Sequence, residues 1–209
     1  ILLDAGDAYE LDGFNKLLIK NPKNKKTILE HYEEYFFNKK IEIVVGYKAI
    51  EVMNQYPNFD YIYNAKWHTT SSSYSLALAL KKTPTIIIPS DYIISDNIVA
   101  KMDKYENCIF FKRSENRRIN SLNLELNNNK AIRVYRGKSS NNDPELMSIF
   151  KISDKEILSK LKKNCINNPM LFVGENIPSE YFNKIAFIEV ENNDIFEINT
   201  PEDYIKYLG

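Results

Sequence analysis

Three short segments of this sequence place polar residues directly after an apolar run, and each of them could bind a charged ligand. The first, "LLDAGDAYELDGFNKLL", holds Gly6 in an acidic loop that leads to Lys16. A glycine lets the backbone approach a phosphate closely, and a following lysine supplies a positive charge for the anion. An ordinary strand-to-helix turn with a solvated lysine has the same pattern, so this segment alone does not decide between the two.

The second segment is "IIIPSDYI", in which Asp91 follows an apolar run and a Pro-Ser step. A carboxylate at the end of a strand can hold Mg²⁺, which takes one or two carboxylates together with phosphate oxygens and waters. Aspartate is also common in turns for local reasons. The residues alone leave both interpretations of Asp91 open.

The third segment, "YNAKWHTTSSSYSLALAL", places serines in front of a Leu/Ala-rich helical pattern. Serines in that position usually cap the helix, but hydroxyls and free N–H groups there can also bind a base edge or a phosphate. Just before the serines, His68 is more typical of a polar surface residue than of a general base. Trp67 is more typical of packing than of stacking on a ligand.

The composition favours a soluble protein with a small or neutral partner. Of 209 residues, 44% are hydrophobic and 12% aromatic, which suffices for one core and favours a single domain over 1–209. Lys+Arg and Asp+Glu number 28 each, so no net charge attracts nucleic acid or an anionic membrane surface. The longest apolar runs, such as "TIIIP" and "IEIVV", are too short to span a bilayer.

The two cysteines, Cys108 and Cys165, lie far apart and lack metal-ligand spacing. We therefore expect neither a disulfide framework nor a zinc site, and this cysteine usage fits a reducing compartment. The expectation is a cytoplasmic protein, a monomer or a homodimer. A removed targeting segment before Ile1 is the minor alternative.

The elements that must position these residues alternate between short apolar runs and helical patterns in the first half of the chain. This alternation predicts βαβ units and an α/β fold with a mostly parallel sheet flanked by helices. Thr27 followed by Glu30 predicts a capping box at the start of a helix. Strands are predicted at 1–3, 41–47, 59–65 and 83–91, and further helices at 49–56 and 71–82.

The second half predicts an antiparallel addition to that sheet. "SLNLELNNNKAIRVYRG" alternates apolar and polar residues on both sides of an Asn-rich turn, which is a β-hairpin pattern. We expect a β-hairpin insertion at about 119–150 that forms a lid or a sheet extension. A helix from Ser153, a strand at 184–191 and a final helix follow, the last with Thr200 as its cap, Pro201 first and Asp203 completing a capping box.

Taken in this order, the segments resemble the nucleotidyltransferase superfamily with a GT-A-like Rossmann fold. The opening segment stands where that family has Leu-Ala-Ala-Gly-x-Gly-x-Arg followed by Pro-Lys-x-Leu, and "IIIPSDYI" stands where it has a metal aspartate. "NAKWHTTSSSYSLALAL" resembles the Asn-x-x-Ser-Leu segment of the choline-phosphate and phosphometabolite cytidylyltransferase branch, in which a CTP:phosphoglutamine cytidylyltransferase would also fall. "FEINTPEDYIKYL" resembles the closing Asn/Asp-Thr-Pro-Glu-Asp helix, so the resemblance covers nearly the whole chain.

The resemblance implies a Rossmann-like fold and a Mg²⁺-dependent reaction. A phosphate oxygen of an acceptor would attack the α-phosphorus of a nucleoside triphosphate and release pyrophosphate, with the protein supplying positioning and charge stabilisation. By the same resemblance Lys16 would meet the triphosphate, Asp91 would hold Mg²⁺, and Asn199 stands at a second metal position. The implied nucleotide-binding residues are Leu3, Ala5, Gly6, Asp7, Ser72, Ser73 and Ser75, and the candidate acceptor-binding residues are Glu10, Lys66 and Trp67.

The opening loop departs from the family pattern in its charge. Ala8 replaces the second loop glycine, Glu10 replaces the arginine that grips the triphosphate, and Asp4 and Asp7 add negative charge. Like charge near a phosphate weakens binding unless a cation offsets it. Either the loop recognises an acceptor that carries an amine, or the domain is a degenerate relative that binds without catalysis.

The expected function is transfer of CMP from CTP to a small phosphorylated or phosphonate acceptor, for decoration of cell-surface polysaccharide such as capsule, or of lipid. Phosphocholine, an aminoalkylphosphonate and phosphoglutamine all carry an amine that would suit Glu10. The choice of CTP rests on the resemblance of the Ser-Leu helix. Two alternatives stay open: a sugar-1-phosphate or cofactor nucleotidyltransferase that uses another nucleotide, and an inert nucleotide-binding domain.

Overall fold

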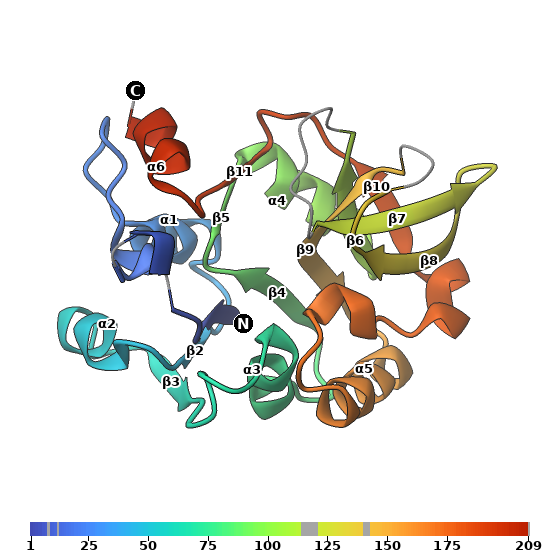
Figure 1. Ribbon diagram of the computed structural model, residues 1–209, viewed down its shortest axis with the longest axis horizontal. Coiled ribbons are helices and arrows are strands. Elements are labelled where there is room, and N and C mark those ends of the chain that lie inside the picture. Colours follow the sequence, from blue (N-terminus) through green and yellow to red (C-terminus); the bar gives the residue numbers. More distant parts are fainter. Residues whose placement is uncertain (8, 12, 114–120, 140–142, 209) are drawn as a thin grey trace.

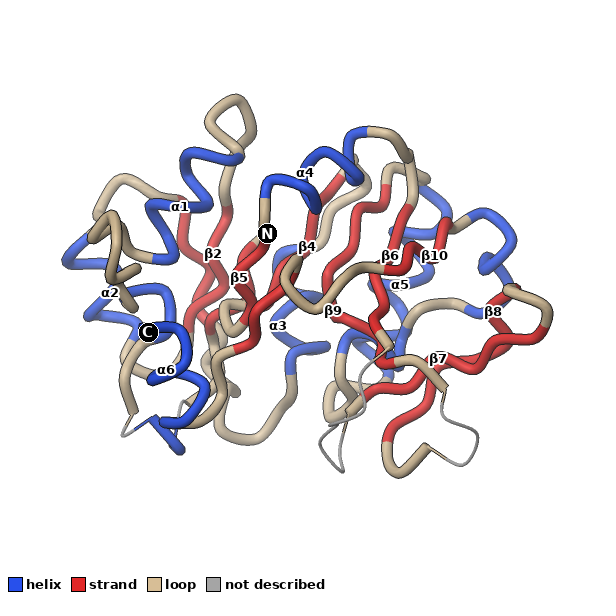
Figure 2. Tube along the Cα trace, turned by 90° about the horizontal axis from the view of Figure 1, so that it is seen from above, coloured by secondary structure: helices blue, strands red, loops and turns tan. Residues whose placement is uncertain are grey.

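The structure is a computed structural model that describes residues 1–7, 9–11, 13–113, 121–139 and 143–208. A sheet runs through the middle of the molecule, and helices cover both of its faces (Figure 1, Figure 2). The strands are β1 (Leu2–Asp4), β2 (Glu42–Val45), β3 (Asp60–Tyr63), β4 (Thr85–Pro89), β5 (Tyr92–Ile94), β6 (Cys108–Lys112), β7 (Leu122–Asn127), β8 (Lys130–Arg136), β9 (Glu145–Ile152), β10 (Ala186–Glu189) and β11 (Ile195–Glu197).

The main path through the sheet is β10-β6-β9-β4-β1-β2-β3. β3, β2, β1 and β4 are parallel neighbours, as are β6 and β10, whereas β9 is antiparallel to both β4 and β6. The predicted α/β architecture with a mostly parallel sheet is therefore confirmed. Since parallel strands end at the same edge, the loops that follow β1, β2 and β4 lie together.

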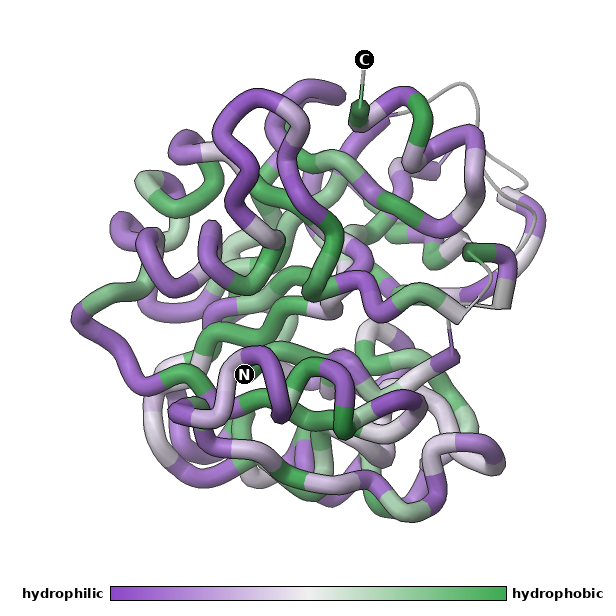
Figure 3. Tube along the Cα trace, turned by 90° about the vertical axis from the view of Figure 1, so that its left-hand side faces the viewer, coloured by the Kyte–Doolittle hydropathy of each residue, from purple (hydrophilic) through white to green (hydrophobic). Residues whose placement is uncertain are grey.

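Side chains of the sheet enter two hydrophobic cores, because successive residues of a strand point to opposite faces. In β2, Ile43 and Val45 belong to one core and Val44 to the other, and all three are completely buried. Burial on both faces explains why this strand reads as a continuous apolar run. Figure 3 shows the result: green, hydrophobic segments cross the middle of the molecule, and much of the outer chain is purple.

Helices α1 and α4 contribute to the first core, and α3 and α5 to the second. Tyr32 of α1 and Met102 of α4 are completely buried in the first, whereas Leu76 of α3 and Leu161 of α5 lie in the second. The helices are α1 (Ile28–Tyr35), α2 (Ala49–Gln55), α3 (Ser72–Ala79), α4 (Asp96–Asp103), α5 (Lys155–Asn167) and α6 (Pro201–Leu208), with short 3-10 helices η1 (Tyr9–Leu11), η2 (Lys16–Leu18), η3 (Val173–Asn176) and η4 (Ser179–Lys184).

Both predicted capping boxes are present. The Thr27 side chain accepts from Glu30 N at 3.2 Å while Thr27 N donates to the Glu30 carboxylate at 2.7 Å. At α6, Thr200 Oγ1 accepts from Asp203 N at 3.2 Å and Thr200 N donates to Asp203 Oδ2 at 2.9 Å. α5 is capped by Asp154 rather than beginning at Ser153, because the Asp154 carboxylate accepts from two N–H groups of the first turn.

The second half of the chain contains both the predicted hairpin and a strand in an unpredicted place. β7 and β8 pair in antiparallel fashion, with an irregular register after Glu125. β9 falls within the stretch expected to form the insertion, yet it lies inside the central sheet between β4 and β6. β5 and β11 form a separate two-stranded ribbon that the sequence did not predict. Within the described residues, no helix is long and apolar enough to cross a membrane.

Candidate active site

A cavity of about 780 Å³ opens at the carboxyl ends of β1, β2 and β4. This edge of an open α/β sheet is where such folds bind ligands. Most of the residues predicted from the sequence line it, namely Leu3, Ala5, Gly6, Asp7, Glu10, Lys16, Trp67, Ser72, Ser75, Asp91 and Asn199. The topology therefore brings together the three segments singled out for their chemistry and the start of the final helix.

Lys16 is held at the cavity by the short helix η2. The Asn15 side chain caps this helix by accepting from Leu17 N at 3.0 Å, and the Leu17 side chain is completely buried. Lys16 Nζ donates to Asn199 Oδ1 at 2.7 Å and lies 4.0 Å from Asp91 Oδ2. The Lys16 side chain is 15% exposed, so water screens its charge only in part.

Asp91 lies where the chain turns from β4 into β5. Its backbone oxygen accepts from Ile198 N at 2.8 Å, which fixes this turn against the end of β11. The Asp91 Oδ1 atom is buried and has no hydrogen-bond partner among the described residues. Because an unpartnered buried carboxylate oxygen is costly, this atom marks a position suited to a cation.

Asn199 comes between β11 and α6, and the cap of α6 fixes its backbone. Asn199 N donates to Asp203 Oδ2 at 3.0 Å, and Asn199 Nδ2 donates to Glu197 Oε1 at 2.6 Å. These two bonds orient the amide so that its oxygen faces the Lys16 ammonium. The Lys16 ammonium group thus links the opening segment of the sequence to Asn199, which lies near its end.

The oxygens of this corner fit a Mg²⁺ ion that is held in part by its substrate. Mg²⁺ in phosphate-transfer sites takes one or two carboxylates and fills its other positions with phosphate oxygens and water. Asp91 Oδ1 and Asn199 Oδ1 would supply a carboxylate and an amide oxygen. Within the part of the chain that the structure describes, no three or more His, Cys, Asp or Glu residues gather as a metal site. The donor set therefore suits a metal shared with phosphates rather than a closed protein site.

Two glycines near the cavity are required for different reasons. At Gly46 an added Cβ would lie 2.4 Å from Ala5 O and 2.6 Å from Trp67 Cβ, so close packing excludes any side chain. At Gly6 an added Cβ would meet nothing within 4 Å. Gly6 lies in a loop that lines the cavity, and the open space beside it is what we expect of a glycine whose backbone a ligand approaches closely.

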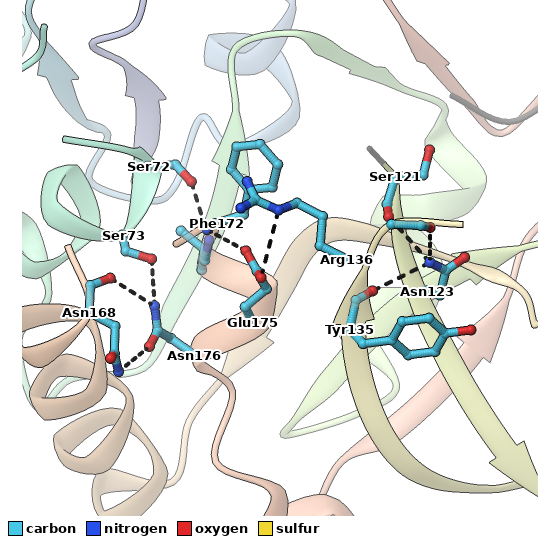
Figure 4. Close-up of polar contacts among 12 residues, drawn as sticks. Ser72, Ser73, Ser121, Asn123, Tyr135, Arg136, Asn168, Phe172, Glu175 and Asn176 are labelled. Carbon is cyan, nitrogen blue, oxygen red and sulfur yellow. Dashed lines mark hydrogen bonds and ion pairs between the residues drawn. The ribbon is translucent and has the colours of Figure 1, made fainter. Parts of the chain in front are cut away.

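The serines at the start of α3 divide into two groups. Ser72 and Ser75 line the cavity, where Ser72 Oγ accepts from Val173 N at 3.2 Å and Ser75 Oγ accepts from Asn64 Nδ2 at 3.0 Å. Ser73 points elsewhere: it is completely buried, and its Oγ accepts from Asn176 Nδ2 at 2.7 Å (Figure 4). The position of Ser73 gives no support to the nucleotide contact predicted for it, and its hydroxyl instead joins α3 to η3.

The candidate acceptor-binding residues also divide. Glu10 and Trp67 line the cavity, and the Trp67 ring lies 5.2 Å from the Tyr47 ring. Lys66 is exposed and is not among the described lining residues; its Nζ lies 5.5 Å from the ring of Tyr74. The described lining of the cavity therefore gives no support to the acceptor contact predicted for Lys66.

Part of the cavity wall comes from the second half of the chain and was not predicted. The Phe172 ring lies 5.0 Å from the Arg136 guanidinium, and Glu175 joins both residues, accepting from Phe172 N at 2.9 Å and lying 3.9 Å from Arg136 Nε (Figure 4). The lining residues of this wall are Ser121, Leu122, Glu145, Leu146, Ser148 and Phe172. They come from separate segments without a local motif, so only the long-range pairing of β7 and β9 could reveal them.

Carboxylates dominate the charge of the cavity. Its acidic lining residues are Asp4, Asp7, Glu10, Asp91, Glu145 and Glu197, whereas Lys16 is the only lysine or arginine among the lining residues described. Burial raises the pKa of Asp4 to about 6, and hydrogen bonds from Ser90 and Asn15 and the charge of Lys16 oppose that rise. Lys16 alone would offset little of the charge of a triphosphate, so further cations are needed for such a ligand.

No protein-family model matches the chain, and no curated protein sequence matches it. Solved structures do match. The chain is similar to CTP:phosphocholine cytidylyltransferase from Streptococcus pneumoniae, with 20% identity, a TM-score of 0.77, and 99% of this chain and 96% of that one covered. It is also similar to the inositol-1-phosphate CTP transferase from T. maritima (12% identity, TM-score 0.72, 99% and 93% covered). A third similar structure is the nucleoside-diphosphate-sugar pyrophosphorylase from Vibrio cholerae RC9 (12% identity, TM-score 0.71, 99% and 98% covered). At these identities the likeness shows that the chain has the fold of nucleotidyltransferases.

Proposed function

We propose that this protein is a Mg²⁺-dependent cytidylyltransferase, which transfers CMP from CTP to a small phosphorylated or phosphonate acceptor and releases pyrophosphate. The observation that carries the proposal is the convergence of Lys16, Asp91 and Asn199 at one corner of the cavity, with a buried carboxylate oxygen left unpartnered there among the described residues. Two of the similar structures are described as using CTP, which supports that choice of nucleotide.

In the proposed reaction a phosphate oxygen of the acceptor attacks the α-phosphorus of CTP. A new P–O bond forms, the bond from the α-phosphorus to the oxygen bridging to the β-phosphate breaks, and that oxygen leaves with pyrophosphate. Lys16 stabilises the negative charge of the triphosphate, and one cavity holds both reactants so that the step becomes effectively unimolecular. Mg²⁺ held by Asp91 and Asn199 would neutralise charge on the phosphate oxygens.

The opening loop and the start of α3 are the proposed nucleotide contacts. Gly6 leaves room for close approach, and Leu3, Ala5 and Asp7 line the same part of the cavity as candidates for contact with base and ribose. Ser72 and Ser75 present hydroxyls at the first turn of α3, a place suited to a base edge or a phosphate. Ser73 is not part of this proposal because its hydroxyl is bound to Asn176.

The acceptor that suits this cavity carries a positive charge. Glu10 and Asp7 are exposed carboxylates of the opening loop, and they face the cavity without a lysine or arginine partner among the described lining residues. Phosphocholine, an aminoalkylphosphonate or a phosphorylated amino acid such as phosphoglutamine would each place an amine there. The role proposed for the product is decoration of cell-surface polysaccharide.

Two other functions have an observation in their favour. Similarity to a nucleoside-diphosphate-sugar pyrophosphorylase favours a sugar-1-phosphate or cofactor nucleotidyltransferase that uses another nucleotide. The scarcity of cations in the described cavity lining favours a domain that binds a nucleotide without catalysis. If neither CTP nor Mg²⁺ changes the melting temperature, the cytidylyltransferase proposal is wrong at its first step.

Pyrophosphate release separates these functions. The protein is incubated with Mg²⁺, each of the four nucleoside triphosphates and a panel of phosphorylated acceptors, each acceptor paired with its deaminated analogue. We expect release only with CTP and an amine-bearing acceptor, and we expect Glu10→Gln to lose the preference for the amine with little change in KM for CTP. Release with a sugar 1-phosphate and another nucleotide would support the second function instead.

A further inference from the structure

A buried carboxylate, Asp4, lies at the end of β1 and has no part in the proposed reaction. It stands at the base of the cavity with 6% of its surface exposed. Its Oδ2 atom accepts a hydrogen bond from Asn15 Nδ2 at 2.8 Å, and this bond is buried. Burying a carboxylate is costly, so a buried carboxylate at the end of a central strand calls for a specific reason.

Asn15 connects Asp4 to the residue that carries the positive charge of the site. While its Nδ2 donates to Asp4, its Oδ1 accepts from Leu17 N at 3.0 Å and so caps η2. Lys16 lies between these two anchored positions, and its Nζ is 2.7 Å from Asn199 Oδ1. The bond between Asp4 and Asn15 therefore ties the start of η2 to the end of β1.

The other neighbour of Asp4 leads to the candidate metal carboxylate. Ser90 hydrogen-bonds to the Asp4 side chain, and Ser90 N donates to Leu3 O at 2.9 Å. Ser90 directly precedes Asp91, whose Oδ2 lies 4.0 Å from Lys16 Nζ. Asp4 thus lies between the turn that carries Lys16 and the turn that carries Asp91, and it is bonded toward each.

We infer that Asp4 is a positioning residue that sets the placement of Lys16 relative to Asp91. Its importance for turnover rests on the proposed function, whereas its effect on Lys16 does not. Because small displacements of a charge from the reacting phosphate are costly in rate, loss of this link should lower kcat more than it raises KM for CTP. The pair of Asp4 and Asn15 can be tested without truncating either side chain, since aspartate and asparagine have nearly the same shape.

The test is a reciprocal exchange. Asn15→Asp keeps an oxygen that can cap Leu17 N, but it turns a donor toward Asp4 into a second carboxylate. Adding Asp4→Asn restores the hydrogen bond in the opposite direction, because the amide at position 4 can now donate to the carboxylate at position 15. At pH 8 we expect Asn15→Asp to lower kcat about 10- to 100-fold and the double variant to recover to within about threefold of the wild type.

The control is a hydrogen-bonded carboxylate of similar burial outside this cavity. Asp194 is 8% exposed and accepts from Ser95 Oγ at 3.0 Å and Asn97 Nδ2 at 2.9 Å. Asp194→Asn should lower the melting temperature and leave kcat unchanged. If it lowers kcat as much as Asn15→Asp does, the effect of the Asp4 pair is general destabilisation and the inference is wrong.

A second readout needs no turnover. In protein with labelled lysine, the Lys16 Cε–Hε signal is identified by its loss in Lys16→Arg, and it is recorded without nucleotide. We expect the signal to move in Asn15→Asp and to return in the double variant. An unmoved signal overturns the inference even if the enzyme is active, and so does a double variant that stays as slow as Asn15→Asp. If the signal moves and returns but no nucleotide is ever transferred, the proposed function fails and the positioning role of Asp4 stands.

Discussion

At the residue scale, the candidate site has many carboxylates and very few positive charges to balance them. Lys16 is the one cation among the described lining residues, and it is shared between Asn199 and Asp91. Lys16 and Asp91 were selected from the sequence because each comes in a polar segment after an apolar run, and Asn199 was implied by the family resemblance. The sequence marked Asp4 only as a negative charge of the opening loop and could not predict that this side chain is buried and bound to Asn15, because that contact is not local. It could not predict Phe172, because an isolated phenylalanine has no motif that distinguishes it.

The first prediction concerns Asp91. Asp91→Asn should lower kcat by about 100-fold or more, since it removes the carboxylate proposed to hold Mg²⁺ beside the phosphates. The melting temperature of the nucleotide-free protein should change little, because Asp91 Oδ1 has no hydrogen bond to lose among the described residues and the ion pair of Oδ2 with Lys16 is long, at 4.0 Å. Turnover assays and calorimetry check both parts, and unchanged Mg²⁺-dependent turnover would remove Asp91 from the site.

The second prediction compares two lysines. Lys16→Ala should raise KM for CTP or lower kcat by about 10- to 100-fold, since Lys16 is the candidate cation for the triphosphate. Lys66→Ala is the matched control, because Lys66 is exposed and is not among the described lining residues. Steady-state kinetics should show wild-type behaviour for Lys66→Ala. The reverse order of effects would mean that the phosphates bind elsewhere.

The third prediction compares two glycines. Gly6→Ala should change the free energy of unfolding by less than about 0.5 kcal/mol, since the added Cβ meets nothing within 4 Å, and it should weaken CTP binding. Gly46→Ala should cost about 1–3 kcal/mol, because its Cβ would lie 2.4 Å from Ala5 O. Denaturant unfolding and calorimetric titration measure the two effects. Tight CTP binding by Gly6→Ala would place the nucleotide away from the opening loop.

At the element scale, what could be predicted from the sequence divides by the range of the interactions involved. The capping boxes at Thr27 and Thr200 are local, and both are present as expected. The location of β9 depends on pairing with β4 and β6, and the ribbon of β5 and β11 joins residues from the middle of the chain to residues near its end. No local pattern specifies such partners, so these elements and the wall they form were missed.

The fourth prediction compares the N-terminal caps of α1 and α6. Thr200→Ala and Thr27→Ala should each destabilise the protein by about 1 kcal/mol, the usual cost of losing a capping side chain. Only Thr200→Ala should also lower kcat, because the Asp203 side chain that completes its cap also binds Asn199 N. Thr27 caps α1, which contributes none of the described residues that line the cavity. Equal kinetic effects of the two variants would show that α6 does not position the site.

At the scale of the whole molecule, the two halves of the sheet have different tasks. The parallel strands β1, β2 and β4 end at the cavity and carry the charged corner, and β9 with the β7–β8 hairpin adds the wall that contains Glu145. The βαβ alternation was enough to predict the parallel strands of the first half, at whose carboxyl ends the cavity opens. The antiparallel half follows from non-local pairing, and it adds a part of the cavity wall that local patterns did not predict.

The central claim is attack on the α-phosphorus of CTP, and the fate of a phosphorus label tests it most directly. Wild-type protein is incubated with Mg²⁺, an amine-bearing phosphorylated acceptor and CTP labelled at either the α- or the γ-phosphate, with Asp91→Asn as the control. We predict that the α label enters the acceptor product and that the γ label leaves in pyrophosphate, and that neither occurs with the variant. Transfer of the γ label to the acceptor, or an α label that stays in CTP with every acceptor while CTP binds, would contradict the account.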